Sequence, residues 1–330
     1  MSHHSSAIAH DSRVLSPRSH LGSPSAGLAW GLVGVVAFSF TVPFTRIAVA
    51  GLDPLFIGCA RAVVAACLAA VALVVGGASR PTTRQWLRLA PVSAGVVAGF
   101  PILTSLALRD TAAGHSAVVI GLLPAATAVV AVSRTHERPG RRFWVGAALG
   151  VIATIAFTVA GHGVPTTPGI ADLYLLAAVV LAAVGYAQGG VMARELGSWQ
   201  TICWALILAS PAMLVTTLVV TDGHLPHATA GQWAAFGYLA AISMFLGFFA
   251  WYRGLAIGPM TTVSQVQLIQ PVLTVVWAIL LLGERPTPEL VVGGAAVIGC
   301  AAFTVRSRVA TGPGGAPVSG ARTGPVSQVS

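Results

Sequence analysis

The sequence contains no lysine and has few charged residues of any kind. Only 8% of its 330 residues are charged and 55% are hydrophobic, whereas a soluble domain has about 25% charged residues. A water-soluble fold cannot bury so much apolar surface, so the solvent around most of this chain is lipid. Most of the arginines behind the net charge of +9 lie outside the apolar runs. This distribution indicates membrane topology rather than binding of nucleic acid.

The motifs of soluble enzymes and metal sites are also missing. The chain has no phosphate-binding loop, no zinc-ligand pair and no GxSxG turn at a strand end. Its four cysteines lie inside apolar runs without metal-ligand spacing, so we expect small core residues rather than ligands or a disulfide framework. They are Cys59, Cys67, Cys203 and Cys300. We therefore expect no metal, no cofactor and no catalytic residue.

What the sequence does contain is ten apolar runs of the length that spans a bilayer, about 20 residues each. The runs are 27–49, 54–77, 87–108, 113–133, 143–161, 171–192, 200–221, 232–253, 260–282 and 289–306. They predict an all-α integral membrane protein with ten transmembrane helices. The tails, 1–25 and 307–330, are rich in Ser, Gly, Pro and His, and we expect them to be disordered.

The arginines predict the orientation of these spans. If the N-terminus is cytoplasmic, 14 of the 18 arginines fall in cytoplasmic segments. Only Arg46, Arg109 and Arg285 fall on the outer side of the membrane, and Arg61 lies within a span. This asymmetry is a strong positive-inside signal, and it places both tails in the cytoplasm.

One stretch of the sequence occurs twice. HERPGRRFWVGAAL, residues 136–149, resembles GERPTPELVVGGAA, residues 283–296, and the offset of 147 residues also aligns Pro124 with Pro271. The chain is therefore a duplication of five spans, 27–161 and 171–306. Because five is odd, the second copy enters the membrane upside down. Inverted repeats are the usual architecture of secondary transporters, with the binding site between the halves.

The same features resemble a known family. They are Arg61 in IGCARAVVAACLAA, the prolines of GLLPAATAVV and IQPVLTVV, and the motif LLGERP followed by VVGGAAVIG. In their order and duplication they resemble the EamA-type branch of the drug/metabolite transporter (DMT) superfamily, over residues 27–306. The resemblance implies ten helices, a central cavity between the halves, both tails inside, and movement of small metabolites, often export.

The ninth span is the most polar, and it supplies most of the substrate-binding candidates. Helical spacing places one polar face at Ser264, Gln267, Pro271 and Thr274. This face lines a cavity, or alternatively its amides hydrogen-bond neighbouring helices and hold them together. The full set of substrate-binding candidates is Ser264, Gln267, Gln270, Thr274, Trp277, Tyr186, Gln188, Thr41 and Thr104.

Four residues are candidates for gating or structural roles: Arg61, His115, Pro124 and Pro271. Arg61 lies about 10 Å inside its span; it binds or gates an anion, or else it snorkels or bonds backbone carbonyls. His115 is a proton site or an interfacial hydrogen bonder. Each proline frees a backbone carbonyl, which is tolerated where protein or a water-filled cavity surrounds it.

These observations favour a secondary transporter of the inner membrane. It would move an amino-acid-like or drug-like solute, as an exporter, by alternating access around the central cavity. No acidic residue lies in the middle of a span, so the sequence does not support proton coupling. The alternatives are a membrane-embedded enzyme, for which Asp110 with His115 is the only cluster, and a non-transporting receptor or scaffold. The expected partners are a small solute and the bilayer, and the oligomeric state stays open.

Overall fold

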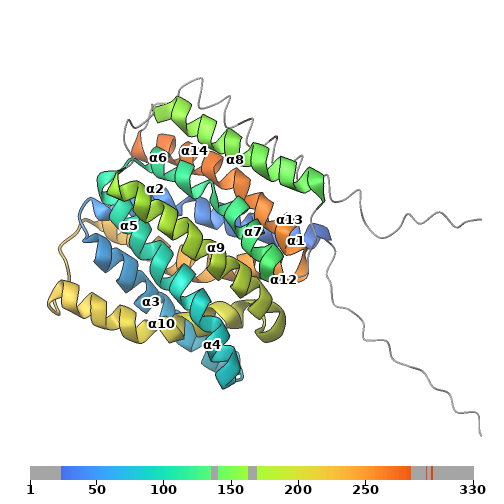
Figure 1. The fold of residues 1–330 in the computed structure, drawn as a ribbon. Coiled ribbons are helices and arrows are strands. Elements are labelled where there is room, and N and C mark those ends of the chain that lie inside the picture. Colours follow the sequence, from blue (N-terminus) through green and yellow to red (C-terminus); the bar gives the residue numbers. More distant parts are fainter. Residues whose placement is uncertain (1–23, 135–139, 163–168, 284–294, 296–298, 300–330) are drawn as a thin grey trace, which may run out of the picture.

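The computed structural model describes residues 24–134, 140–162 and 169–283, together with 295 and 299. Every regular element in these residues is helical (Figure 1). The first half contains α1 (Pro24–Ser39), α2 (Thr41–Val49), α3 (Pro54–Val75), α4 (Thr83–Val92), the π-helix η1 (Ser93–Gly99), α5 (Phe100–Asp110), α6 (Ala113–Ile120), α7 (Leu123–Arg134) and α8 (Arg141–His162). The second half contains α9 (Ile170–Leu196), α10 (Ser198–Thr221), α11 (Ala230–Tyr238), the π-helix η2 (Leu239–Leu246), α12 (Gly247–Ile257), α13 (Met260–Ser264), the 3-10 helix η3 (Gln265–Ile269) and α14 (Gln270–Leu282).

Seven helical segments of the described residues are long and apolar enough to cross a membrane. They are Ser25–Val49, Pro54–Val75, Thr83–Asp110, Ile170–Leu196, Ser198–Thr221, Ala230–Ile257 and Met260–Leu282. The expected fourth span is divided into two short helices, α6 and α7. The expected tenth span, 289–306, and the second copy of the repeated Glu-Arg-Pro lie almost entirely outside the described residues.

Local sequence explains where several of these segments begin. Asp53 caps α3 by accepting hydrogen bonds from the backbone of Leu55 and Phe56, at 2.8 and 3.1 Å, and Pro54 occupies the first turn, where its missing N–H costs nothing. Thr82 and Gln85 form a capping box at the start of α4. Thr229 and Gln232 form the same box at the start of α11, 147 residues later.

The two halves share more than these caps. The third and eighth spans each change to a π-helix two to three turns after the capping box, in η1 and η2. The fourth span breaks at Gly121–Leu122, and the ninth narrows to the 3-10 helix η3. Each of these breaks lies just before its proline, Pro124 or Pro271. Four irregularities therefore occur as two matched pairs, at the offset that the sequence repeat defines.

Helix packing pairs the halves in the same way. The first span of the first half, α1, packs against α12 of the second half. In the same way the first span of the second half, α9, packs against α5 of the first half. The second and seventh spans, α3 and α10, pack against each other. Figure 1 shows α8 and α10 at opposite edges of this bundle, with α5 and α9 between them. Exchanging the two halves leaves this set of contacts unchanged, as expected for a repeat.

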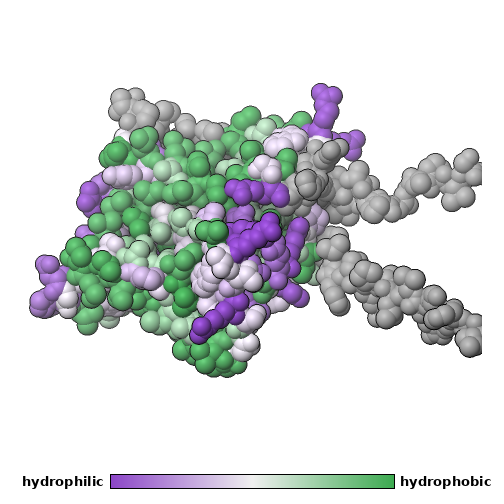
Figure 2. All heavy atoms as spheres, turned by 60° about the horizontal axis from the view of Figure 1, so that its bottom comes forward, coloured by the Kyte–Doolittle hydropathy of each residue, from purple (hydrophilic) through white to green (hydrophobic). Residues whose placement is uncertain are grey.

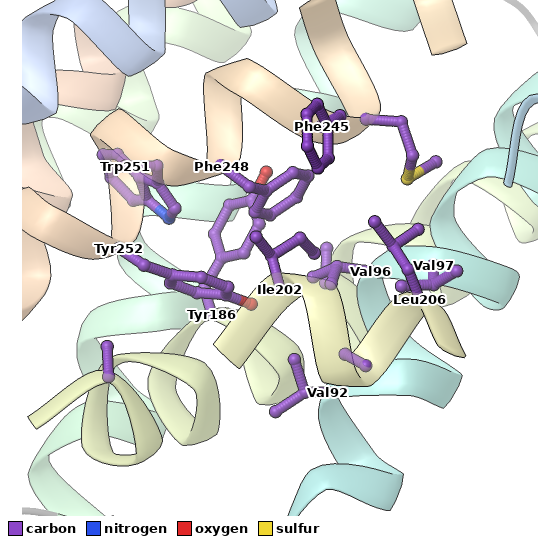
Figure 3. Packing of buried hydrophobic residues seen from close by; sticks show 14 of the residues in the cluster. Val92, Val96, Val97, Tyr186, Ile202, Leu206, Phe245, Phe248, Trp251 and Tyr252 are labelled. Atoms are coloured by element: carbon purple, nitrogen blue, oxygen red, sulfur yellow. The ribbon is translucent and has the colours of Figure 1, made fainter. Parts of the chain in front are cut away.

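Glycines bring α1 and α12 into backbone contact. A Cβ on Gly254 would lie 2.7 Å from the backbone nitrogen of Gly31, and one on Gly27 would lie 2.8 Å from the Cα of Gly258. Gly27 and Gly31, which form a GxxxG pair in the sequence, thus mark a close helix crossing between the halves. Beside this crossing lies the largest apolar cluster, in which aromatic rings of α9, η2 and α12 pack with Val92, Val96 and Val97 of the first half (Figure 3). The Tyr186 and Trp251 rings are 5.4 Å apart, centroid to centroid.

The outside of the bundle is apolar where a bilayer would contact it. Valines and leucines are exposed along the helices, and Val74 and Val75 are more than 80% exposed. Figure 2 shows hydrophobic residues over the middle of one face and hydrophilic residues gathered towards its two ends. Exposed aliphatic side chains of this density indicate contact with lipid rather than water.

The glycine crossing gives a direct stability prediction. Gly254→Ala should lower the melting temperature of the purified protein by several degrees, because the added methyl group meets backbone atoms that cannot rotate away. The matched control is Gly237→Ala in α11, where a Cβ meets nothing within 4 Å. That change should leave the melting temperature unchanged or raise it. Equal effects of the two substitutions would contradict the close crossing.

Candidate functional site

Two adjacent cavities lie where the halves meet. The larger, here called the arginine cavity, is lined by Phe38, Thr41, Val42, Arg61, Val96, Phe100, Pro101, Tyr186, Ser243, Met244, Phe248 and Gln270. The smaller, here called the glutamine cavity, is lined by Val42, Ala117, Ile120, Leu123, Pro124, Gln267, Gln270, Pro271 and Thr274. Val42 and Gln270 line both, so these two side chains form the wall between them.

Both cavities are small in this conformation. Measured for the centre of a water molecule, their volumes are about 20 Å³ and about 10 Å³, room for one or a few waters. A solute with the bulk of an amino acid needs the lining side chains to move apart. The structure is therefore that of a nearly closed site.

Helix irregularities supply the walls of the arginine cavity. Val96 comes from the π-helix η1 and Ser243 from the π-helix η2. Thr41 begins α2, directly after the interruption of the first span at Phe40. A π-turn or a break rotates the following side chains out of regular helical phase, and such segments are frequent at functional sites. The cavity thus lies at the points where three spans depart from ideal geometry.

Arg61 is the only buried charged side chain among the residues that the structure describes. It projects from α3 into the wall of the arginine cavity and is 1% exposed. Its Nε atom has no hydrogen-bond partner, and the described residues offer its guanidinium no ion pair. A charge in this position is costly unless something compensates it.

Hydroxyl groups connect the halves beside this arginine. The Thr41 and Ser243 hydroxyls are 2.8 Å apart and buried. Thr274 donates from Oγ1 to the carbonyl oxygen of Ser39 at 3.0 Å, and the Trp277 indole N–H donates to the Ser39 hydroxyl at 2.9 Å. The ninth span is therefore bonded to the break in the first span, which fixes the position of the cavity wall.

Two amides of the ninth span line the glutamine cavity. Gln267 and Gln270 are buried, and both line this cavity. Neither amide atom of Gln267 makes a hydrogen bond of normal length, although its amide lies near the Tyr186 hydroxyl. Gln265 reaches across to the other half, where its Nε2 lies 3.5 Å from the Pro124 carbonyl oxygen. An amide without a partner in a cavity is available to a ligand.

Several predicted site residues line neither cavity. The hydroxyls of Ser264 and Thr104 donate to backbone carbonyls of their own helices, those of Thr261 and Phe100. Trp277 stacks on Phe40, with ring centroids 4.2 Å apart. His115 belongs to α6, and its side chain lies outside the described residues.

Gln188 lies away from both cavities, at the end of the bundle that carries Arg88, Arg134 and Glu195, here called the arginine-rich end. Its side chain accepts a hydrogen bond from Arg134 at 3.1 Å and donates to the Arg88 carbonyl oxygen at 3.2 Å. About two helical turns further along α9, Glu195 forms an ion pair with Arg88 of α4 at 2.7 Å. These contacts link α9 of the second half to α4 and α7 of the first half.

Sequence reasoning missed much of the cavity lining. The unforeseen residues are mostly apolar or come from the π-helices: Phe38, Val42, Val96, Phe100, Pro101, Ser243, Met244 and Phe248. The one signal that could have located them is the repeated Thr-x-x-Gln capping box, which aligns the third span with the eighth.

Comparison with known proteins decides the family. The model of the EamA-like transporter family matches residues 25–159 and again residues 169–306. The chain belongs to the EamA-like transporter family. It has two EamA domains and is a multi-pass protein of the bacterial cell membrane. EamA proteins are transporters, not enzymes, so the alternative of a membrane-embedded enzyme is excluded.

Two relatives cover most of the EamA chain. It is 40% identical over 276 residues to the uncharacterized transporter YdeK of Bacillus subtilis (strain 168), covering 84% of this chain and 96% of that protein. It is 27% identical over 269 residues to a probable terminal-alkyne amino-acid exporter of Streptantibioticus cattleyicolor, covering 81% of this chain and 89% of that protein. A crystal structure of a protein with 16% identity matches with a TM-score of 0.71, over 88% of this chain and 100% of that one. That likeness shows the fold alone.

The hydroxyl pair between the halves gives a prediction for this EamA site. Thr41→Val and Ser243→Ala should each reduce the stability of the purified protein, and the double variant should lose less than the sum. The shared hydrogen bond predicts a coupling of about 0.5–1.5 kcal/mol. Denaturant or thermal unfolding of the four proteins measures it. Strict additivity would show that the two hydroxyls do not interact.

Proposed function

We propose that this EamA transporter exports a small amphipathic, amino-acid-like solute by alternating access, with the solute held in the two adjacent cavities. One observation carries the proposal most directly: the cavities lie between the halves and are lined by matched helix irregularities from both of them. Secondary transporters place their sites at such a repeat interface, and discontinuous helices usually form them.

The proposal includes a full membrane topology. Ten helices form two inverted repeats, 27–161 and 171–306, and the tails 1–25 and 307–330 lie in the cytoplasm. The positive-inside distribution of arginine supports this orientation. The matched capping boxes and π-helices of the third and eighth spans support the repeat. An odd number of spans in each copy makes the two copies antiparallel.

Rocking of one half against the other would expose the cavities to each side in turn. In the present conformation the Arg88–Glu195 pair and the Arg134–Gln188 hydrogen bond join the halves at the arginine-rich end. Both side chains of the ion pair are more than a third exposed, so the pair is worth about 1 kcal/mol or less. Such a contact is weak enough to open and reform during each transport cycle.

The chemistry of the lining supports the class of solute. Aromatic rings and aliphatic side chains surround an arginine, hydroxyls and amides, a combination that suits a molecule with an apolar body and a polar end. The direction of transport and the amino-acid character draw on the relative described as a probable terminal-alkyne amino-acid exporter.

Export can be tested by comparing metabolites in the medium of cells that overproduce the protein, cells that lack it, and cells with Gln267→Ala. A compound should rise with the wild-type protein. With Gln267→Ala its rate of appearance should fall about 5- to 10-fold, because one hydrogen bond to the solute is lost. Gln200→Ala, the same change outside both cavities, should export normally at equal expression.

A medium that is identical for all three strains would contradict export. Export that continues undiminished with Gln267→Ala would instead remove the glutamine cavity from the pathway while leaving the transport function in place.

The topology can be tested with an impermeant thiol reagent on intact cells. In a cysteine-free background, Gly140→Cys should stay unlabelled because it lies in the cytoplasmic loop between α7 and α8. His224→Cys, which follows α10 and is exposed, should be labelled. The reverse pattern would overturn the orientation, and labelling of both sites from outside would overturn the inverted repeat.

A further inference from the structure

The charge balance of the arginine cavity is incomplete. The described residues contain five acidic side chains, all at helix ends or in loops: Asp53, Asp110, Asp172, Glu195 and Asp222. None of them lines either cavity. Arg61 is therefore a positive charge inside the bundle with no counter-charge in the part of the chain that the structure describes.

The structural roles open to a buried arginine do not account for Arg61. A snorkelling side chain reaches water or headgroups, but Arg61 is 1% exposed. An arginine that holds helices together donates to backbone carbonyls, as Arg194 does to Leu255 and Gly258. Arg61 makes no such hydrogen bond, and its Nε is buried without a partner. Its guanidinium is left with donors directed at a cavity that can hold a ligand.

We propose that Arg61 binds the carboxylate of the transported solute and so makes a carboxylate the required group of the substrate. This inference rests on the proposed function, since it assigns the polar end of the solute that the cavities carry. A guanidinium presents a planar fork of N–H donors that matches a carboxylate with two parallel hydrogen bonds. The bound anion would also remove the cost of the uncompensated charge.

Neighbouring groups complete a carboxylate site and shape the rest of the ligand. Thr41 and Ser243 line the same cavity and share one hydrogen bond, so one of the two hydroxyl protons remains to donate to a lone pair of the anion. The Phe38 and Phe248 rings, 4.9 Å apart, border it with apolar surface. Beyond Gln270, the glutamine cavity would take the far end of the solute once its lining side chains move apart. No described carboxylate is placed to pair with an ammonium, so an amino group is tolerated rather than required.

The test uses three probes that share a terminal-alkyne body: L-propargylglycine, its carboxamide, and 4-pentynoic acid, which lacks the amino group. Binding to the purified full-length protein in lipid nanodiscs is measured by calorimetry. Both acids should bind the wild-type protein, and the amide should bind about 10- to 100-fold more weakly, the range expected for loss of a paired charge-assisted contact.

Variants separate ligand recognition from folding. Arg61→Gln should abolish the preference for acid over amide, and Arg61→Lys, which keeps the charge without the fork, should retain part of it. The control Arg109→Gln removes an exposed arginine outside both cavities and should keep the full preference. If Arg61→Gln does not fold, the reduced acid-to-amide ratio of Arg61→Lys makes the same test, because a purely structural role would not change that ratio.

Every outcome bears on the proposal. Equal affinity of the wild-type protein for acid and amide, an undiminished preference in both Arg61 variants, or no binding of either acid would each overturn it. Failure of the export proposal looks different: the purified protein prefers acids through Arg61, but overproducing cells release no compound. If cells instead export a solute without a carboxylate, and Arg61→Gln exports it normally, then export stands and this inference falls.

Discussion

Lipid offers no hydrogen bonds, and this constraint decides where the polar side chains of the protein lie. Aliphatic residues face outward, as in the run that ends at Val75. The hydroxyls and amides of the spans turn inward, where each must find a partner within the protein or remain available. Most are satisfied by short local bonds or by contacts between the halves, as at Thr41 and Ser243. Arg61 and Gln267 are among the side chains with polar atoms left without a partner, and these two lie in the walls of the two cavities.

The duplicated architecture explains why the cavities occur at that place. The two EamA domains bring the same segments of both halves to one central region, so a local irregularity in one half has its counterpart in the other. Here the π-helices of the third and eighth spans and the breaks of the fourth and ninth meet around the cavities. Regular helices pack without voids, whereas these interrupted ones leave polar backbone and space. The glycine crossing of α1 on α12 holds the halves close enough for the space to stay small.

Hydropathy predicted the spans that the structure describes. The repeat and the motifs around Arg61, the two prolines and LLGERP predicted the family. The polar face of the ninth span predicted Gln267, Gln270 and Thr274 as substrate-binding candidates, and all three line the cavity that both prolines border. Their role in binding stays a prediction. A regular helical face places Ser264 beside Gln267, but Ser264 lines neither cavity, and the 3-10 helix η3 lies between it and Pro271. The π-helices have no strong sequence signal, so Ser243 and Val96 were missed. Gln188 could not be placed from sequence, since its partners Arg134 and Arg88 are distant in the chain.

The central claim is that the two halves rock about the cavities between them. Paired spin labels measure this motion as distances across each end of the bundle: Arg84→Cys with Arg253→Cys at the arginine-rich end, and Asp110→Cys with His224→Cys at the opposite end. In nanodiscs, adding a transported solute should change the two distances in opposite directions, one end closing as the other opens. Distances that lengthen together, or that never change in a protein shown to transport, would contradict alternating access by rocking of the repeats.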